Sequence, residues 1–193
     1  MRFFAGEPSK RSAQLAATFI ETAKLIVQKL PDAQFLVPLV SRETRILFEN
    51  MQWKLGAQEL PITLLFGHAH DAMIAADIVL VASGTATLEA ALLKRPMVIT
   101  YKMPVLTYWL SKRKQYLPYF GLPNILAGKF VVPELIQEDA TPENLTQALL
   151  NLVENKQAVA ELEEIFTNMH VMLRQGTAHK AAQAILPFLN GCT

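Results

Sequence analysis

The chain has 193 residues, with 18 lysines and arginines against 17 aspartates and glutamates, and a formal net charge of +1 at pH 7. So balanced a charge argues against a nucleic-acid-binding protein that relies on a broad positive field. Hydrophobic residues make up 51% of the chain and charged residues only 18%. This excludes a disordered protein, because such a chain buries enough apolar surface to offset its conformational entropy. The apolar surplus also predicts that part of the surface is covered at an interface.

Short apolar runs alternate with amphipathic stretches over the first hundred residues. The runs predict strands at 3–5, 35–37, 62–66, 78–81 and 97–101. The stretches between them predict helices at 12–30, 41–54, 71–76 and 85–94. Ser41 is expected to cap the second helix, with Ile46, Leu47 and Met51 facing the interior. The strands lack polar alternation, which is typical of a parallel sheet covered on both faces. The order predicts an α/β fold, a Rossmann-like doubly wound parallel sheet with right-handed crossovers.

The composition changes after residue 101. Four prolines punctuate residues 102–140, where one aromatic and basic helix is expected near 105–114. Thr141-Pro142-Glu143 is a helix start, with a capping hydroxyl, a proline in the first turn and an acid near the positive helix end. Two further helices are expected at 157–174 and 178–189. We therefore expect one domain with three parts: a βα core at 1–101, a loop-rich segment at 102–140 and C-terminal helices at 141–193.

The turn at residues 83–89 offers the stronger ligand site, because ligands of open α/β sheets bind at the carboxyl ends of strands. Gly84 lets the backbone approach a ligand closely, and Ser83 and Thr85 offer hydroxyl donors beside unpaired amides. The positive helix end favours a diphosphate there. Glu89 lies about one turn further on, where its carboxylate could accept two hydrogen bonds from a vicinal diol such as ribose. The alternative is a capped turn in which Glu89 only complements the helix dipole.

The other polar clusters give weaker signals. Residues 6–12 begin with Gly6 like a phosphate loop but lack its Gly-Lys-Ser/Thr ending, which favours a plain helix entry. His68 and His70 have no third ligand at metal-site spacing, the chain contains no Asp-x-Asp, and Cys192 is its single cysteine. We expect no metal, no cofactor and no intrachain disulfide.

A basic cluster at 112–114 follows Tyr108 and Trp109. Aromatic residues beside cations suit an anionic lipid surface, and the alternative is a solvated helix end. The longest apolar stretches, 72–76 and 78–82, are far shorter than the ~18 residues that suggest a membrane span. Residues 1–7 lack the apolar core of a signal peptide. A soluble, cytoplasmic protein is expected.

Five segments occur together in a distinctive order: 83–89, 96–98, 101–103, 109–113 and 122–128. Their order and spacing closely resemble the C-terminal half of the lipid-A-disaccharide synthase family, glycosyltransferases of the two-domain GT-B type. The similarity runs from about Leu15 to the end of the chain. It implies one half of a GT-B fold, a single domain at 1–193 that binds the UDP portion of UDP-2,3-diacylglucosamine. It also implies an inverting transfer to 2,3-diacylglucosamine 1-phosphate, which gives the β-1′,6-linked disaccharide of lipid A and UDP.

The resemblance assigns roles residue by residue. It implies that the nucleotide is held by Ser83, Gly84, Thr85, Glu89 and Gly6. It implies a catalytic position for Asn124, near the reacting centre, and a lipid or membrane contact for Trp109, Lys112 and Arg113. It further implies a Gram-negative setting, a peripheral place on the inner membrane and a homodimer formed by exchange of the C-terminal segment.

Two departures from the family pattern bear on activity. The family's N-terminal half, which supplies the acceptor pocket, has no counterpart in the sequence. Pro8 stands where the family has the arginine of a Gly-Ser-Arg turn, and Lys10 or Arg11 is the available substitute. We expect a chain that binds UDP and does not complete glycosyl transfer alone. The alternatives are another UDP-sugar GT-B transferase, a UDP-N-acetylglucosamine epimerase, or a non-catalytic UDP-binding or assembly module.

Overall fold

The computed structural model describes residues 2–5, 13–103, 108 and 116–189. Its centre is one parallel sheet with the strand order β3-β2-β1-β4-β5-β6. The strands are β1 (Arg2–Ala5), β2 (Gln34–Leu39), β3 (Ile62–Phe66), β4 (Ile78–Ala82), β5 (Met97–Tyr101) and β6 (Glu134–Ile136). This order confirms the doubly wound fold, because the direction of winding reverses between β1 and β4. The sequence did not predict β6, a short strand of three half-buried residues.

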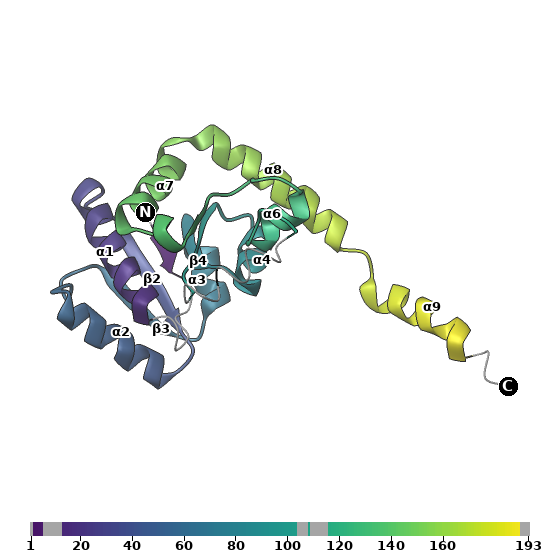
Figure 1. The fold of residues 1–193 in the computed structure, drawn as a ribbon, viewed down its shortest axis with the longest axis horizontal. Coiled ribbons are helices and arrows are strands. Elements are labelled where there is room, and N and C mark those ends of the chain that lie inside the picture. The colour runs from purple at the N-terminus through teal and green to yellow at the C-terminus, as the bar shows by residue number, and fades with distance from the viewer. Residues whose placement is uncertain (1, 6–12, 104–107, 109–115, 190–193) are drawn as a thin grey trace.

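Helices cover the sheet on both faces (Figure 1). The α-helices of the described residues are α1 (Ala13–Lys29), α2 (Arg42–Lys54), α3 (Ala69–Ala75), α4 (Thr85–Leu92), α6 (Leu122–Ala127), α7 (Pro142–Glu154), α8 (Lys156–Leu173) and α9 (Thr177–Leu189), of which α9 lies away from the sheet. The predicted caps form: the side chains of Ser41 and Thr141 accept hydrogen bonds from the third residue of α2 and of α7. The sequence did not predict helix α6, because a proline lies in its first turn and its six residues are too few for periodicity to show.

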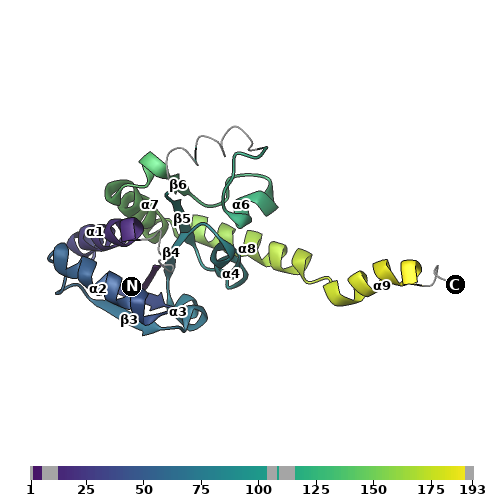
Figure 2. The same cartoon turned by 60° about the horizontal axis from the view of Figure 1, so that its bottom comes forward.

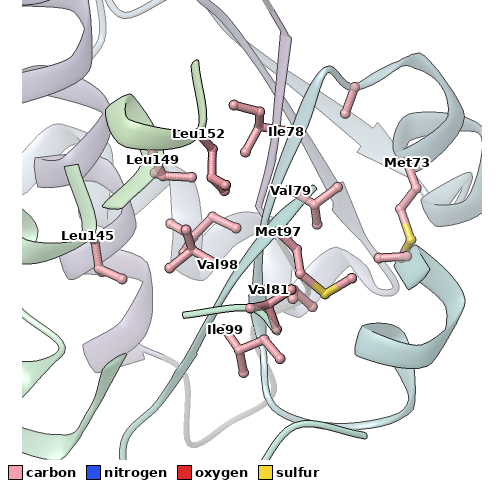
Figure 3. Packing of buried hydrophobic residues seen from close by; sticks show 14 of the residues in the cluster. Met73, Ile78, Val79, Val81, Met97, Val98, Ile99, Leu145, Leu149 and Leu152 are labelled. Carbon is pink, nitrogen blue, oxygen red and sulfur yellow. The ribbon is translucent and has the colours of Figure 1, made fainter. Parts of the chain in front are cut away.

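The buried core lies on both sides of β4 and β5, whose residues 78–81 and 97–99 are nearly inaccessible to solvent. Figure 3 shows Ile78 and Val98 turned toward Leu149 and Leu152 of α7. Val79 and Met97 lie on the opposite face, the side of Met73 in α3. A strand packed on both faces needs apolar residues at every position, which explains the absence of polar alternation.

The prediction that Ile46 and Leu47 of α2 face the interior is wrong. Ile46 and Leu47 are 48% and 45% exposed, whereas Phe48 is 2% exposed and Thr44 is buried with it. Met51 is half-buried against the same small cluster. The helix therefore buries the face of Thr44, Phe48 and Met51, and the two adjacent aliphatic residues lie to its outer side. Apolar residues alone did not identify the face, because the buried row begins with a threonine.

Helix α9 extends away from the rest of the fold (Figures 1 and 2). Ile185, Leu186 and Phe188 are 55%, 50% and 78% exposed. An amphipathic helix without a surface to cover its apolar side is where the predicted apolar surplus appears. Among the described residues, no helix combines the length and the apolar character that crossing a bilayer requires.

Candidate functional site

The first turn of α4 lies at the carboxyl end of β4, where the predicted ligand site was placed. The Ser83 amide donates to the Thr100 carbonyl at 2.9 Å, which ties the turn to β5. Within the helix, the Thr87 amide and hydroxyl both donate to the Gly84 carbonyl, at 3.1 and 2.7 Å. No side chain among the described residues caps α4. Among the described residues, no group therefore accepts from the amides of Thr85 and Ala86, and the helix dipole favours an anion there.

Gly84 keeps this end of the helix open. A Cβ added to it would have no atom of the described structure within 4 Å. Its φ of 160° is extended backbone, which any residue adopts, so backbone strain is not the reason for glycine. The consequence of glycine at this position is free space beside the helix amides, which allows close approach by a bulky anion.

Ser83 and Thr85 differ in what their hydroxyl groups can do. The Ser83 hydroxyl donates to the Phe120 carbonyl at 2.9 Å, so its hydrogen is already used within the protein. Thr85 is exposed at the start of α4. The geometry gives Ser83 the role of holding the turn against the segment before α6. Hydroxyl donation to a diphosphate remains a prediction, and it fits Thr85 better, whose hydroxyl forms no hydrogen bond with another described residue.

Glu89 lies four residues after Thr85 and is exposed. Positions four apart share one face of a helix, so the carboxylate lies on the side of the open first turn. Among the described residues, Glu89 forms no ion pair. An exposed carboxylate beside an anion site is consistent with a ligand that has a diol next to its phosphates.

Asn124 is completely buried and its side chain is fully hydrogen-bonded. Its amide nitrogen donates to the Val132 carbonyl at 2.9 Å and to Glu134 Oε1 at 2.7 Å. Its oxygen accepts from the amides of Val131 and Val132, at 2.7 and 3.0 Å. These four bonds use the whole capacity of an asparagine side chain. None remains for a substrate, so the structure favours a positioning role over the catalytic role that the resemblance implied.

Glu134 links Asn124 to the turn at Ser83, and sequence reasoning missed it. Its carboxylate accepts from the amides of Phe120 and Gly121, both at 2.8 Å. A Cβ at Gly121 would lie 2.2 Å from Ile99 Cδ1, so a larger residue there would displace the side chain of Ile99. A chain of contacts thus runs from Ser83 through Phe120 and Glu134 to Asn124. No sequence motif marks Glu134, because its partners lie 10 to 14 residues away and form no periodic pattern.

Lys102 is a second residue that sequence reasoning did not single out. It follows β5, is half-buried, and its Nζ donates to Thr18 Oγ1 of α1 at 3.3 Å. The next residue is fixed by Gln137, which accepts from the Met103 amide at 2.6 Å and donates to the Met103 carbonyl at 2.9 Å. Lys102 therefore places a cation at the same edge of the sheet as the start of α4.

The family model described as Lipid-A-disaccharide synthetase matches residues 3–188. The chain belongs to this family. The lipid-A-disaccharide synthase of Dechloromonas aromatica is 58% identical over 191 residues, and that of Methylobacillus flagellatus is 53% identical over 184. The alignments cover 97% and 95% of the chain and 50% and 49% of these proteins. The chain thus spans about half the length of the curated relatives it matches.

Solved structures show the fold. The UDP-GlcNAc 2-epimerase of Neisseria meningitidis, solved with UDP-GlcNAc, has a TM-score of 0.56 at 15% identity, covering 85% of this chain and 39% of that one. Staphylococcus aureus TarM, solved with UDP among its ligands, has a TM-score of 0.61 at 16% identity, covering 97% and 34%. At such low sequence identity, the likeness to these structures shows only the fold, which is one half of a GT-B fold. Epimerases share it, so membership of the lipid-A-disaccharide synthase family rests on the sequence matches.

Several residues named by the family resemblance lie outside the described residues. These are Gly6, Pro8, Lys10, Arg11, Trp109, Lys112 and Arg113. Of the two histidines considered as metal ligands, His68 has Nδ1 2.9 Å from Asp71 Oδ2. In the described ranges, no group of three histidine, cysteine, aspartate or glutamate side chains is arranged to hold a metal ion.

Proposed function

We propose that this chain is the donor-binding half of a lipid-A-disaccharide synthase. The open start of α4, with Gly84 beside it and Glu89 on the same face, carries the proposal. In it the diphosphate of UDP-2,3-diacylglucosamine accepts from the first amides of α4, and Glu89 accepts from the ribose hydroxyls. Lys102 adds a positive charge at the same edge. The two solved neighbours described above, one with UDP-GlcNAc and one with UDP, support the choice of nucleotide.

The proposed chemistry is an inverting displacement. The 6-hydroxyl oxygen of 2,3-diacylglucosamine 1-phosphate bonds to the anomeric carbon as the bond from that carbon to the diphosphate breaks. The helix end stabilises the negative charge that develops on the departing UDP. The proton of the attacking hydroxyl passes to a general base, which none of the residues assigned here supplies. We therefore expect the base and the acceptor pocket to come from the half of the relatives that this chain does not match.

Titration calorimetry with UDP tests the binding. Heat that saturates with one UDP per chain is expected, and no heat at millimolar UDP would remove the proposal. Substantial disaccharide synthesis by the chain alone would contradict the expected incompetence. Comparing acylated with plain UDP-sugars separates this function from another GT-B transferase or an epimerase, because only the lipid enzyme should prefer acyl chains. UDP binding with no transfer even beside the remaining half would leave a non-catalytic binding module.

A Glu89→Gln variant tests the ribose contact. Hydrogen bonds to a charged acceptor contribute ~1.5–3 kcal/mol each, so we expect UDP affinity to fall by about tenfold or more. The affinity for 2′-deoxy-UDP should fall less, because one hydroxyl of the diol is already missing. Calorimetry with both nucleotides on both proteins measures the coupling. An equal loss for the two nucleotides would place Glu89 away from the ribose.

We also propose that Trp109, Lys112 and Arg113 contact an anionic lipid surface, which would place the protein peripherally on the inner membrane. The support is their composition, since aromatic rings and cations together suit the interface of an anionic bilayer.

The exposed apolar side of α9 leads us to propose a homodimer in which α9 packs on a second copy. Light scattering should then show the mass of a dimer. The double variant Ile185→Glu and Phe188→Glu should be a monomer, because burying an unpaired carboxylate in the interface costs free energy. Ile74→Glu on α3, where Ile74 is 46% exposed, is the matched control and should leave the dimer intact. A clean monomer of the unaltered chain at every concentration would rule out the exchange.

A further inference from the structure

A second apolar surface lies at one corner of the sheet, where α2 and β3 are side by side in both views (Figures 1 and 2). Val40, Ile46 and Phe66 are 60%, 48% and 65% exposed there. A hollow of about 540 Å³ is lined by Ile46 and Phe66 together with charged residues of α2. We call this the α2–β3 surface, made of Val40, Arg42, Arg45, Ile46, Glu49 and Phe66. Single exposed apolar residues are ordinary, whereas a group around a hollow indicates an interface.

The α2–β3 surface begins at the carboxyl edge of the sheet, the edge at which the proposed donor site lies. All strands run parallel, so the residue after β2, Val40, and the last residue of β3, Phe66, lie at the carboxyl edge with Ser83 and Gly84. Two strand spacings separate β2 from β4 and three separate β3 from β4, which is about 10–14 Å. A body that covers the donor site to bring an acceptor to it therefore extends over this corner as well.

The charges of the α2–β3 surface define the complementary chemistry. Arg45 Nε lies 2.7 Å from Glu49 Oε1, so these two charges are paired within α2. Arg42 forms no ion pair with any described residue, and it lies in the first turn of the helix, where the dipole does not favour a cation. The surface therefore suits a partner with apolar side chains for Ile46 and Phe66 and a carboxylate for Arg42.

We propose that the α2–β3 surface docks the half of a full-length lipid-A-disaccharide synthase that this chain does not match. The inference rests on the proposed donor site, because that site determines which edge must be covered. The alignments leave about half of each relative outside the chain, a body large enough to cover both places. Interfaces between domains of one chain commonly bury 600–1,500 Å². Docking there would cover Ile46, an aliphatic residue that the isolated chain leaves exposed on the outer side of α2.

Thiol footprinting tests the docking. Ile46→Cys, in a chain whose own cysteine is removed by Cys192→Ser, is compared between the isolated chain and a chimera with the unmatched half of the Dechloromonas aromatica protein. We expect alkylation to slow by about an order of magnitude or more in the chimera, because interface cores pack as densely as protein interiors. Ile74→Cys, matched in exposure and placed on α3, should react at the same rate in both proteins. The same cysteine at the aligned position of the full-length Dechloromonas protein gives a second measurement in a natural chain.

Three other outcomes of the footprinting overturn the proposal. Equal alkylation at Ile46→Cys in the isolated chain and the full-length proteins means that the other half lies elsewhere. Protection of the isolated chain that rises with its own concentration means that a second copy covers the surface. Protection only when anionic phospholipid vesicles are added means that a membrane does. UDP calorimetry on the same proteins reports on the donor site separately, so loss of UDP binding with intact protection would reject the proposed function and keep the docking.

Discussion

An Asn124→Ala variant should lose about 3 kcal/mol or more of its free energy of unfolding, a change typical of a broken buried hydrogen-bond network. The truncation leaves the buried amide and carbonyl of Val132 and the amide of Val131 without their partner. It also removes one of the donors that hold Glu134. Urea unfolding followed by circular dichroism measures the loss as a lower midpoint at an unchanged slope.

Asn151→Ala is the matched control for this variant. Asn151 is exposed on α7, and its side-chain oxygen accepts from Gln147 Nε2 at 2.8 Å on the helix surface, so its truncation should change stability by about 0.5 kcal/mol or less. If Asn124→Ala folds with the stability of the unaltered chain and loses only transfer activity in the full-length protein, the positioning role is wrong. Asn124 would then contact the substrate in a state in which its four hydrogen bonds are broken.

A Gly84→Val variant should bind UDP about a hundredfold more weakly, a loss of ~2.7 kcal/mol. The branched side chain would occupy the free space beside the first amides of α4, where the diphosphate is proposed to lie. Its folding should be nearly unaffected, because no described atom lies within 4 Å of a Cβ at this position and its φ suits any residue. Calorimetry gives the affinity, and urea unfolding gives the stability.

The control for Gly84→Val is Ala75→Val, which adds the same isopropyl group in place of a small side chain. Ala75 is exposed at the end of α3, near the opposite edge of the sheet. It should leave UDP affinity unchanged. UDP affinity of Gly84→Val equal to that of the unaltered chain would remove the nucleotide from the start of α4.

The sheet could be predicted from sequence because its strands are dense apolar runs with sharp ends. The predicted bounds of β3 and β5 match the structure. Pro61 and Gly67 border β3, and Pro96 precedes β5 directly. The turn at Gly84 followed from the same logic, since it joins a buried strand to a helix at the carboxyl end of the sheet, and its role as a ligand site stays a prediction.

What the sequence did not reveal depends on contacts between distant residues. The position of Asn124 was assigned a role by resemblance, yet its partners at 131–134 decide what its side chain can do. The side of α2 that turns outward is decided by the packing of Phe48 against residues of α1 and β2. Helical spacing in the sequence does not show which residues those are. Short elements such as α6 and β6 are held by Glu134 rather than by their own propensity.

Nuclear magnetic resonance of the nitrogen-15-labelled chain during a UDP titration tests the central claim most directly. We expect the backbone amides of Gly84, Thr85 and Ala86 to shift most and to saturate together, with that of Glu89 shifting as well. Shifts confined to residues at the amino ends of the strands, such as Arg95, or no shift at millimolar UDP, would contradict it.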